Sequence, residues 1–175
     1  MRTAFFHEDD YCQYEILPLT ARDFCLEEMA KITAFEKEHR IQSGPYTFYT
    51  DIYVRGANSH SVEELLLHPE QLDDALVFLP AFDVVETGYS SYHRRLTTAR
   101  CRGSSSGIRV FWSFDNKGFV NSIWLDLNIG PETIEESKCV LNALGCLAPL
   151  LLADWNSHEC VNLSSPQEIE HYFSA

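Results

Sequence analysis

The residues whose types could best support catalysis or metal binding lie near the start of the chain, in FFHEDDYCQYEILP at residues 5–18. The run HEDD, residues 7–10, places a histidine beside three carboxylates, and the thiol of Cys12 follows. These groups can bind a metal or form an acid/base pair. A zinc or calcium site needs ligands that converge, and the spacing matches neither HExxH nor an EF-hand loop. The run also lies in the predicted turn of a hairpin that joins strands 3–7 and 11–17, and side chains in such a turn diverge into solvent. We therefore interpret HEDD as a solvated turn or, next, as an acidic loop that binds a protein.

A second candidate is the tripeptide HEC at residues 158–160. Combined with His7, Cys12 or His171 it could supply zinc ligands, but no CxxC-like or HxxxH-like frame surrounds it. We expect a loop histidine beside a buried thiol. The sequence therefore predicts no metal site and no cofactor.

A third candidate is Gly103-Ser-Ser-Ser-Gly107, which matches G-x-S-x-G with Ser105 at its centre. A nucleophile elbow needs a strand before this motif and a helix after it. Here the strand-like IRVFWSF follows, so we expect a loop and predict no catalytic residue. One function that these groups leave open is that of a small metal-dependent enzyme that uses His7, Asp9, Asp10 or His158.

Five arginines gather in the middle of the chain, and no Asp or Glu lies between residues 86 and 115. Guanidinium groups suit phosphates and carboxylates, but no glycine-rich loop that opens a helix accompanies them. They either pair with carboxylates on neighbouring elements or form a site for an anion or an acidic partner. The five are Arg94, Arg95, Arg100, Arg102 and Arg109.

The elements that must position these groups alternate irregularly, which is typical of an α+β fold with a largely antiparallel sheet packed against helices. We expect residues 1–175 to form one such domain. The clearest hairpin joins strands 108–114 and 119–127. Other strands are predicted at 3–7, 11–17, 46–54 and 160–163. Residues 82–102 are predicted to form one or two more strands, with a turn at 86–88. A first helix is predicted from an N-cap at Thr20 to about residue 42, and a short second one follows a capping box at Ser61 and Glu64. Three more helices are predicted to begin at Pro69, Pro131 and Pro166, the first of them ending near Leu79.

The longest apolar run, CVLNALGCLAPLLLA at residues 139–153, is too short for the ~20 residues that span a bilayer. We predict a buried core helix that breaks near Gly145 to Pro149.

Composition limits the function further. The 175 residues are 45% hydrophobic, enough for a core, and carry a formal net charge of −13. Such a charge disfavours nucleic acid and anionic membranes as partners and favours a basic protein. Six scattered cysteines and the lack of a signal peptide indicate the cytoplasm.

The closing segment, LLLADWNSHECVNLSSPQEIEHYFSA, resembles the end of many bacterial immunity proteins of polymorphic-toxin and contact-dependent growth-inhibition systems. The resemblance implies a non-enzymatic inhibitor that binds a cognate toxin domain, such as a basic nuclease, and occludes its active site. The matching residues are Asp154, Trp155, Asn156, Val161, Asn162, Leu163, Pro166, Glu168, Ile169 and Tyr172.

Acidic residues that follow one another on predicted turns and helices are our candidates for contact with such a partner. They are Glu8, Asp9, Asp10, Glu63, Glu64, Asp73 and Asp74.

Overall fold

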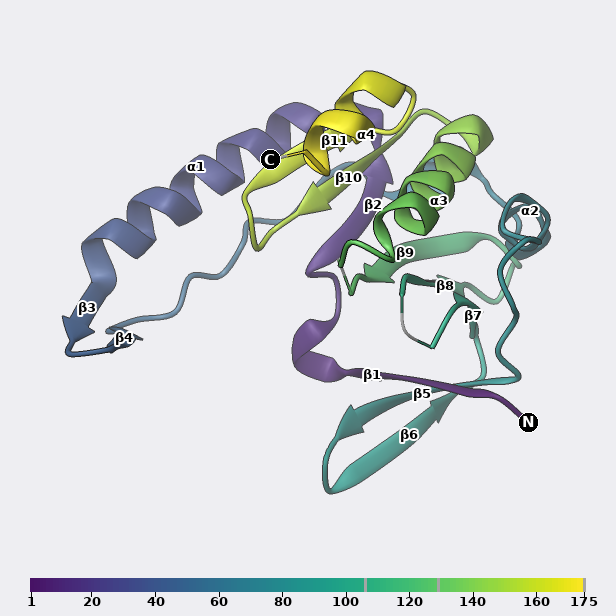
Figure 1. Ribbon diagram of the computed structural model, residues 1–175, viewed down its shortest axis with the longest axis horizontal. Coiled ribbons are helices and arrows are strands. Elements are labelled where there is room, and N and C mark those ends of the chain that lie inside the picture. The colour runs from purple at the N-terminus through teal and green to yellow at the C-terminus, as the bar shows by residue number, and fades with distance from the viewer. Residues whose placement is uncertain (106, 129, 175) are drawn as a thin grey trace.

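The computed structural model describes residues 1–105, 107–128 and 130–174. Its centre is a six-stranded antiparallel sheet in the order β11-β10-β2-β9-β8-β7 (Figure 1). The described residues also form four α-helices and two smaller sheets, so the predicted α+β class with largely antiparallel pairing is confirmed. The six strands are β2 (Tyr14–Pro18), β7 (Ala99–Gly103), β8 (Arg109–Phe114), β9 (Val120–Asp126), β10 (Leu150–Asp154) and β11 (Glu159–Asn162).

One face of this sheet packs on helices α2 (Pro69–Ala75), α3 (Ile134–Leu147) and α4 (Pro166–Tyr172). The side chains that alternate along the strands explain this contact, since Val110, Trp112, Ile123 and Leu125 all enter the same buried cluster. The predicted hairpin of β8 and β9 is confirmed, as is Pro69 in the first turn of α2.

The opposite face is covered by two different elements. Leu17, Leu151 and Ala153 pack under α1 (Arg22–His39), whereas Phe111 and Trp124 pack under a three-stranded sheet. That small sheet has the order β1-β5-β6, from β1 (Thr3–His7), β5 (Val84–Tyr89) and β6 (Tyr92–Leu96), with β1 parallel to β5.

The predicted hairpin of residues 3–7 and 11–17 is wrong. Its two strands exist, but β1 belongs to the small sheet and β2 to the large one. The short 3₁₀ helix η1 (Glu8–Asp10) carries the chain from one sheet to the other. The acidic run therefore connects two layers instead of closing a hairpin.

The turn predicted at residues 86–88 is also wrong, because these residues lie inside β5 and the chain reverses between Tyr89 and Tyr92. Gly88 has φ +145°, and a Cβ there would lie 1.9 Å from the carbonyl oxygen of Tyr92. The glycine permits close approach of two strands, which its sequence context does not distinguish from a turn.

The apolar run 139–153 is not one helix. Helix α3 ends at Leu147, and β10 follows as a strand in which every residue is buried. Because helices cover both faces of β10, its residues are all apolar apart from the last, and the alternation typical of a half-exposed strand is lost. Gly145 allows close contact, since a Cβ there would lie 1.9 Å from the carbonyl oxygen of Leu163.

Two further boundaries differ from prediction. Helix α1 follows a 3₁₀ turn, η2 (Leu19–Ala21), so its N-cap is Ala21 and not Thr20. The strand predicted at 46–54 is only β4 (Tyr46–Tyr49), which pairs with β3 (Arg40–Ser43). The capping box at Ser61 is confirmed, and it begins the 3₁₀ helix η3 (Val62–Leu65).

Candidate functional site

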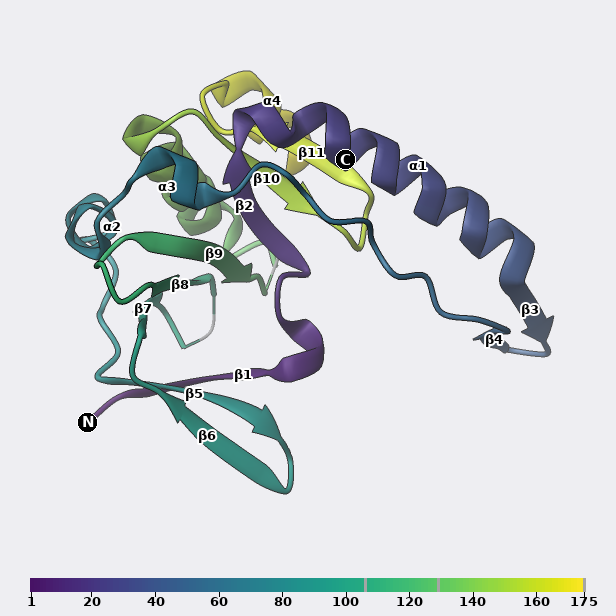
Figure 2. The ribbon, with the colours of Figure 1, turned by 180° about the vertical axis from the view of Figure 1, so that it is seen from behind.

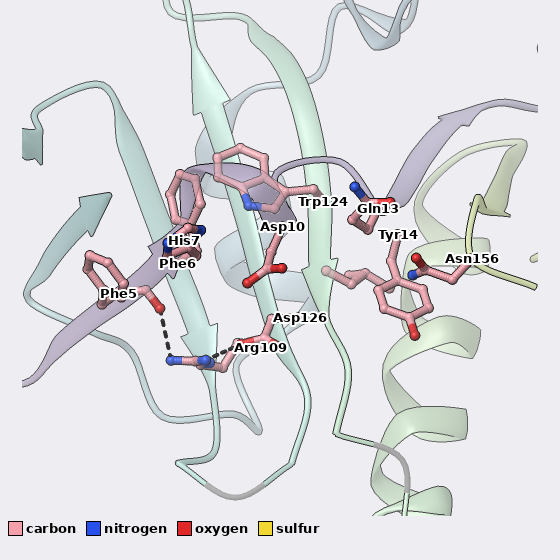
Figure 3. Close-up of a pocket in the computed structure, with 11 residues that line it drawn as sticks. Phe5, Phe6, His7, Asp10, Gln13, Tyr14, Arg109, Trp124, Asp126 and Asn156 are labelled. Atoms are coloured by element: carbon pink, nitrogen blue, oxygen red, sulfur yellow. Dashed lines mark hydrogen bonds and ion pairs between the residues drawn. The ribbon is translucent and has the colours of Figure 1, made fainter. Parts of the chain in front are cut away.

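The acidic run lies over a crevice between the two sheets. A pocket of about 520 Å³ opens beside η1, with Asp10, Arg109, Trp124 and Asp126 among its lining residues (Figure 3). Arg109 donates to the carbonyl oxygen of Phe5 at 3.2 Å and pairs with Asp126, so this arginine joins the small sheet to the large one. Asp10 points into the pocket, and within the described chain its carboxylate has no hydrogen bond or ion pair.

The neighbouring acidic residues are engaged differently. The Asp9 carboxylate lies 3.5 Å from Nδ1 of His7, and Glu8 lies 3.8 Å from the guanidinium of Arg94. Glu8 and Asp9 thus lie close to partners, whereas the carboxylate of Asp10, at the end of the run, has none among the described residues and lies beside aromatic side chains. Across the described residues, no group of three His, Cys, Asp or Glu is placed to hold a metal ion.

The other predicted contact residues lie on separate elements. Glu64 closes the capping box by accepting from the backbone of Ser61 at 3.1 Å, while Glu63 on the same turn is exposed. On α2, Asp74 is exposed but Asp73 accepts from two arginines. The structure does not bring these four residues together with η1 into one acidic surface.

The arginines of the middle segment are largely paired. Arg100 contacts Asp73 at 2.6 Å and Glu70 at 2.8 Å, and Arg102 contacts Asp73 at 2.7 Å and the carbonyl oxygen of Leu79 at 2.9 Å. These contacts fasten α2 to β7, the edge strand of the large sheet. Two guanidinium groups that share one carboxylate are expected where arginines stabilise the fold by holding elements together.

The remaining arginines of the set lie at the small sheet or beside it. Arg109 and Arg94 have the partners given above, and Arg95 is directly opposite Glu86 in the pairing of β5 with β6. The five side chains thus point to different neighbours and do not form one open site for an anion.

The two other chemical candidates also have structural neighbours. His158 lies in the turn before β11, where its Nδ1 is 3.0 Å from the hydroxyl of Thr33 on α1. Ser105 lies in the connection between β7 and β8, two strands of one hairpin, so the strand-to-helix context of a nucleophile elbow is missing there.

The feature that sequence reasoning missed is an arm that projects from the body. Helix α1 is 18 residues, about 27 Å, long, and in this fully described helix the last buried residue is Met29. Its second half extends away from the large sheet and carries β3 and β4 at its tip (Figures 1 and 2). All eight residues of the two strands are exposed. We call the second half of α1 with β3 and β4 the arm.

Large apolar side chains cover the arm and the segment that returns from it. Phe48 is 55% exposed, and Ile52 and Val54 are more than 80% exposed. The signal was present in the sequence YTFYTDIYV, but its aromatic and β-branched residues read equally well as a buried strand. We call this surface the arm patch; it comprises Ile41, Tyr46, Phe48, Tyr49, Ile52 and Val54.

The returning segment, residues 50–60, is irregular and lies along α1 as a strap (Figure 2). Its first anchor is the nearly buried carboxylate of Glu28, which accepts from the backbone N–H of Gly56 at 2.8 Å, Tyr53 Oη at 3.0 Å and Lys31 Nζ at 2.6 Å. These donors, Lys31 first, lower the pKa of Glu28 to about 2.

The second anchor of the strap is Arg55. Its guanidinium lies 4.2 Å from the ring centre of Trp155 and donates to Glu15 at 3.4 Å, while the Trp155 indole N–H donates to the same carboxylate at 3.2 Å. Burial raises the pKa of Glu15 despite these contacts. The two anchors hold the strap to α1 and β2, so they fix the position of the arm-patch residues that belong to the strap.

The polar residues of the closing segment have a local structural role. The buried carboxylate of Asp154 accepts from the backbone N–H groups of Asn156 and Ser157, at 2.9 and 3.1 Å, and from the hydroxyls of Ser157 and Tyr172, at 2.6 and 2.8 Å. These bonds form the turn between β10 and β11 and fasten α4 to it. Residues that carry the resemblance to immunity proteins thus build the fold, and they do not identify a contact surface.

Comparison of the chain with protein-family models, curated proteins and solved structures finds no match to any of them. In the described part of the chain, every helix is too short or too polar to cross a bilayer. The resemblance of the closing segment to immunity proteins therefore stays a prediction.

Proposed function

We propose that this protein is a cytoplasmic immunity protein that binds a basic toxin domain and occludes its active site. The observation that carries the proposal is the arm: a two-stranded hairpin that projects from the body with exposed aromatic residues. An isolated hairpin of this size is marginally stable in water, and a contiguous exposed apolar surface is typical of protein contact sites. Binding to a partner would bury the arm patch and complete the packing of the hairpin.

The charge of the chain favours a partner of opposite sign. A second copy would also carry −13, so two arms that approach each other bring two strongly acidic bodies together. A basic domain would instead be attracted, and its encounter rate would rise at low salt. A nuclease active site is one basic surface that an acidic protein can cover by occupying the place of nucleic-acid phosphates.

The acidic run is the proposed second contact. Figures 1 and 2 show η1 on the side of the body toward which the arm projects. Asp10, whose carboxylate has no partner among the described residues, lies at a pocket walled by Trp124 and Phe6, which suits a lysine or arginine side chain of the partner. The arm would then supply apolar contact and η1 the charged contact.

The test is affinity capture with matched variants. The wild-type protein is the bait in a lysate of cells that express a toxin encoded beside it, and captured proteins are identified by mass spectrometry. We expect one basic protein at 1:1, at least tenfold less of it with Phe48→Ser/Tyr49→Ser, and no change with Val77→Ser/Phe78→Ser. The control pair is equally exposed but lies after α2, away from the arm. No 1:1 partner, or equal loss with both pairs, contradicts the proposal.

The acidic contact has its own measurement. Replacing Glu8, Asp9 and Asp10 together with alanine should slow association with the captured partner at least tenfold at low salt and much less at high salt, because salt screens long-range attraction. An association rate equal to that of the wild type at low salt removes η1 from the interface.

A further inference from the structure

Three sulfur atoms meet where α1 packs against β11. Cys25 and Met29 are four residues apart and therefore lie on the same side of α1. Cys160 faces them from β11, with its Sγ 3.6 Å from Sδ of Met29, and packs against the cluster that contains Cys25. Cys25 and Met29 are buried in an apolar cluster, and Cys160 is half-buried at its edge.

We propose that Cys25, Met29 and Cys160 form a binding site for a soft monovalent metal ion, Cu(I), with two thiolates and one thioether as ligands. Thiolate and thioether ligands select Cu(I) over harder cations. Three sulfurs bound to one ion in a plane at about 2.3 Å lie roughly 4 Å from one another, so the 3.6 Å between Cys160 and Met29 needs only a small expansion.

Zinc fits this cluster less well. It prefers four nitrogen, oxygen or thiolate ligands in a tetrahedron, and the described residues place no third His, Cys, Asp or Glu with the two cysteines. The sequence predicts no metal site at Cys160 because the third ligand is a methionine on a distant helix. Such a set becomes visible only when the fold brings the two elements together.

Binding is an exchange of protons for metal. Each thiol gives up its proton to solvent, Cu(I) releases the ligands that carried it, two Cu–thiolate bonds and one Cu–thioether bond form, and neither copper nor sulfur changes oxidation state. The ion would cross-link α1 to β11 at the base of the arm, so binding should raise the melting temperature of the reduced protein.

The experiment is anaerobic competition for Cu(I) between the reduced full-length protein and bicinchoninate, with Cu(I) supplied as its acetonitrile complex. We expect the wild type to withdraw one Cu(I) per chain, and Cys25→Ser and Cys160→Ser to withdraw none. Met29→Leu keeps the volume of the side chain and should bind at least tenfold more weakly with an unchanged fold. X-ray absorption should show three sulfur neighbours in the wild type and two in Met29→Leu.

The control removes the two exposed thiols, which lie outside the cluster. Cys139 and Cys146 are exposed on α3, and Cys139→Ser/Cys146→Ser should retain full Cu(I) binding. Loss of binding in this control, failure of the wild type to compete, or Met29→Leu equal to the wild type in both affinity and sulfur count would each overturn the proposal.

Discussion

Replacing Glu28 with alanine removes the carboxylate that holds the strap against α1. Two of its hydrogen bonds reach the strap, from the N–H of Gly56 and the hydroxyl of Tyr53. A hydrogen bond to a charged group contributes about 1.5–3 kcal/mol, and both donors are near the surface, so the lower value applies to each. The free energy of local opening of the strap should fall by about 3 kcal/mol, while the core stays folded because other contacts hold it.

Amide hydrogen exchange of peptides from residues 50–60 measures this opening directly. A loss of about 3 kcal/mol corresponds to roughly 100-fold faster exchange in the strap, with peptides from β10 unchanged. Glu27→Ala is the matched control, since it removes a carboxylate from the preceding residue of α1, whose side chain is exposed. Exchange in the strap that rises less than threefold in Glu28→Ala, or rises equally in Glu27→Ala, would refute the role assigned to Glu28.

Three more outcomes follow. The folded-state pKa of Glu28 is lowered to about 2 from 4.5. The stabilisation that its carboxylate gives the strap is therefore full above about pH 4.5 and is lost as pH falls through 2. Hydrogen exchange of the strap in the wild type and in Glu28→Ala should therefore converge at low pH. Asp73→Ala leaves Arg100 and Arg102 without their shared partner and should cost about 2 kcal/mol in urea unfolding, whereas Asp74→Ala should cost under 0.5 kcal/mol. Gly145→Ala should destabilise by about 2 kcal/mol in thermal unfolding, against the usual gain from alanine in a helix, because its Cβ would meet the carbonyl of Leu163; an unchanged or higher melting temperature contradicts the close contact.

Local signals in the sequence predicted the elements that local chemistry determines. The hairpin of β8 and β9 has a turn rich in Asp, Asn and Gly between two β-branched and aromatic runs, and the structure contains it. The capping box at Ser61 and the proline that starts α2 likewise depend on residues within one helical turn. These features need no knowledge of distant neighbours.

The errors arose where distant contacts decide the structure. β10 reads as helix because both its faces are buried, and its partner β2 lies near the opposite end of the chain. Residues 3–7 and 11–17 read as a hairpin because β5, the true partner of β1, is some 80 residues away. The parallel pairing of β1 with β5 has no signal in the turn between the expected strands.

The contact residues expected from the sequence stay a prediction. The sequence FFHEDDYC places the acidic run beside aromatic residues, but it contains no signal for the pairing of Asp73 with two arginines. The arm was missed because the same aromatic residues suit a buried strand and an exposed hairpin. Only the path of α1 beyond Met29 shows that the strands near its end lie outside the core.

The most direct test of the proposed immunity function is a growth assay with the captured partner. The partner is expressed alone, with the wild-type protein, with Phe48→Ser/Tyr49→Ser, or with Val77→Ser/Phe78→Ser, each at equal level. We expect that the partner alone stops growth, that the wild type and the control pair restore it, and that the arm pair does not. Growth with the partner alone, or equal rescue by the arm pair, would contradict the claim that the arm binds and neutralises a toxin.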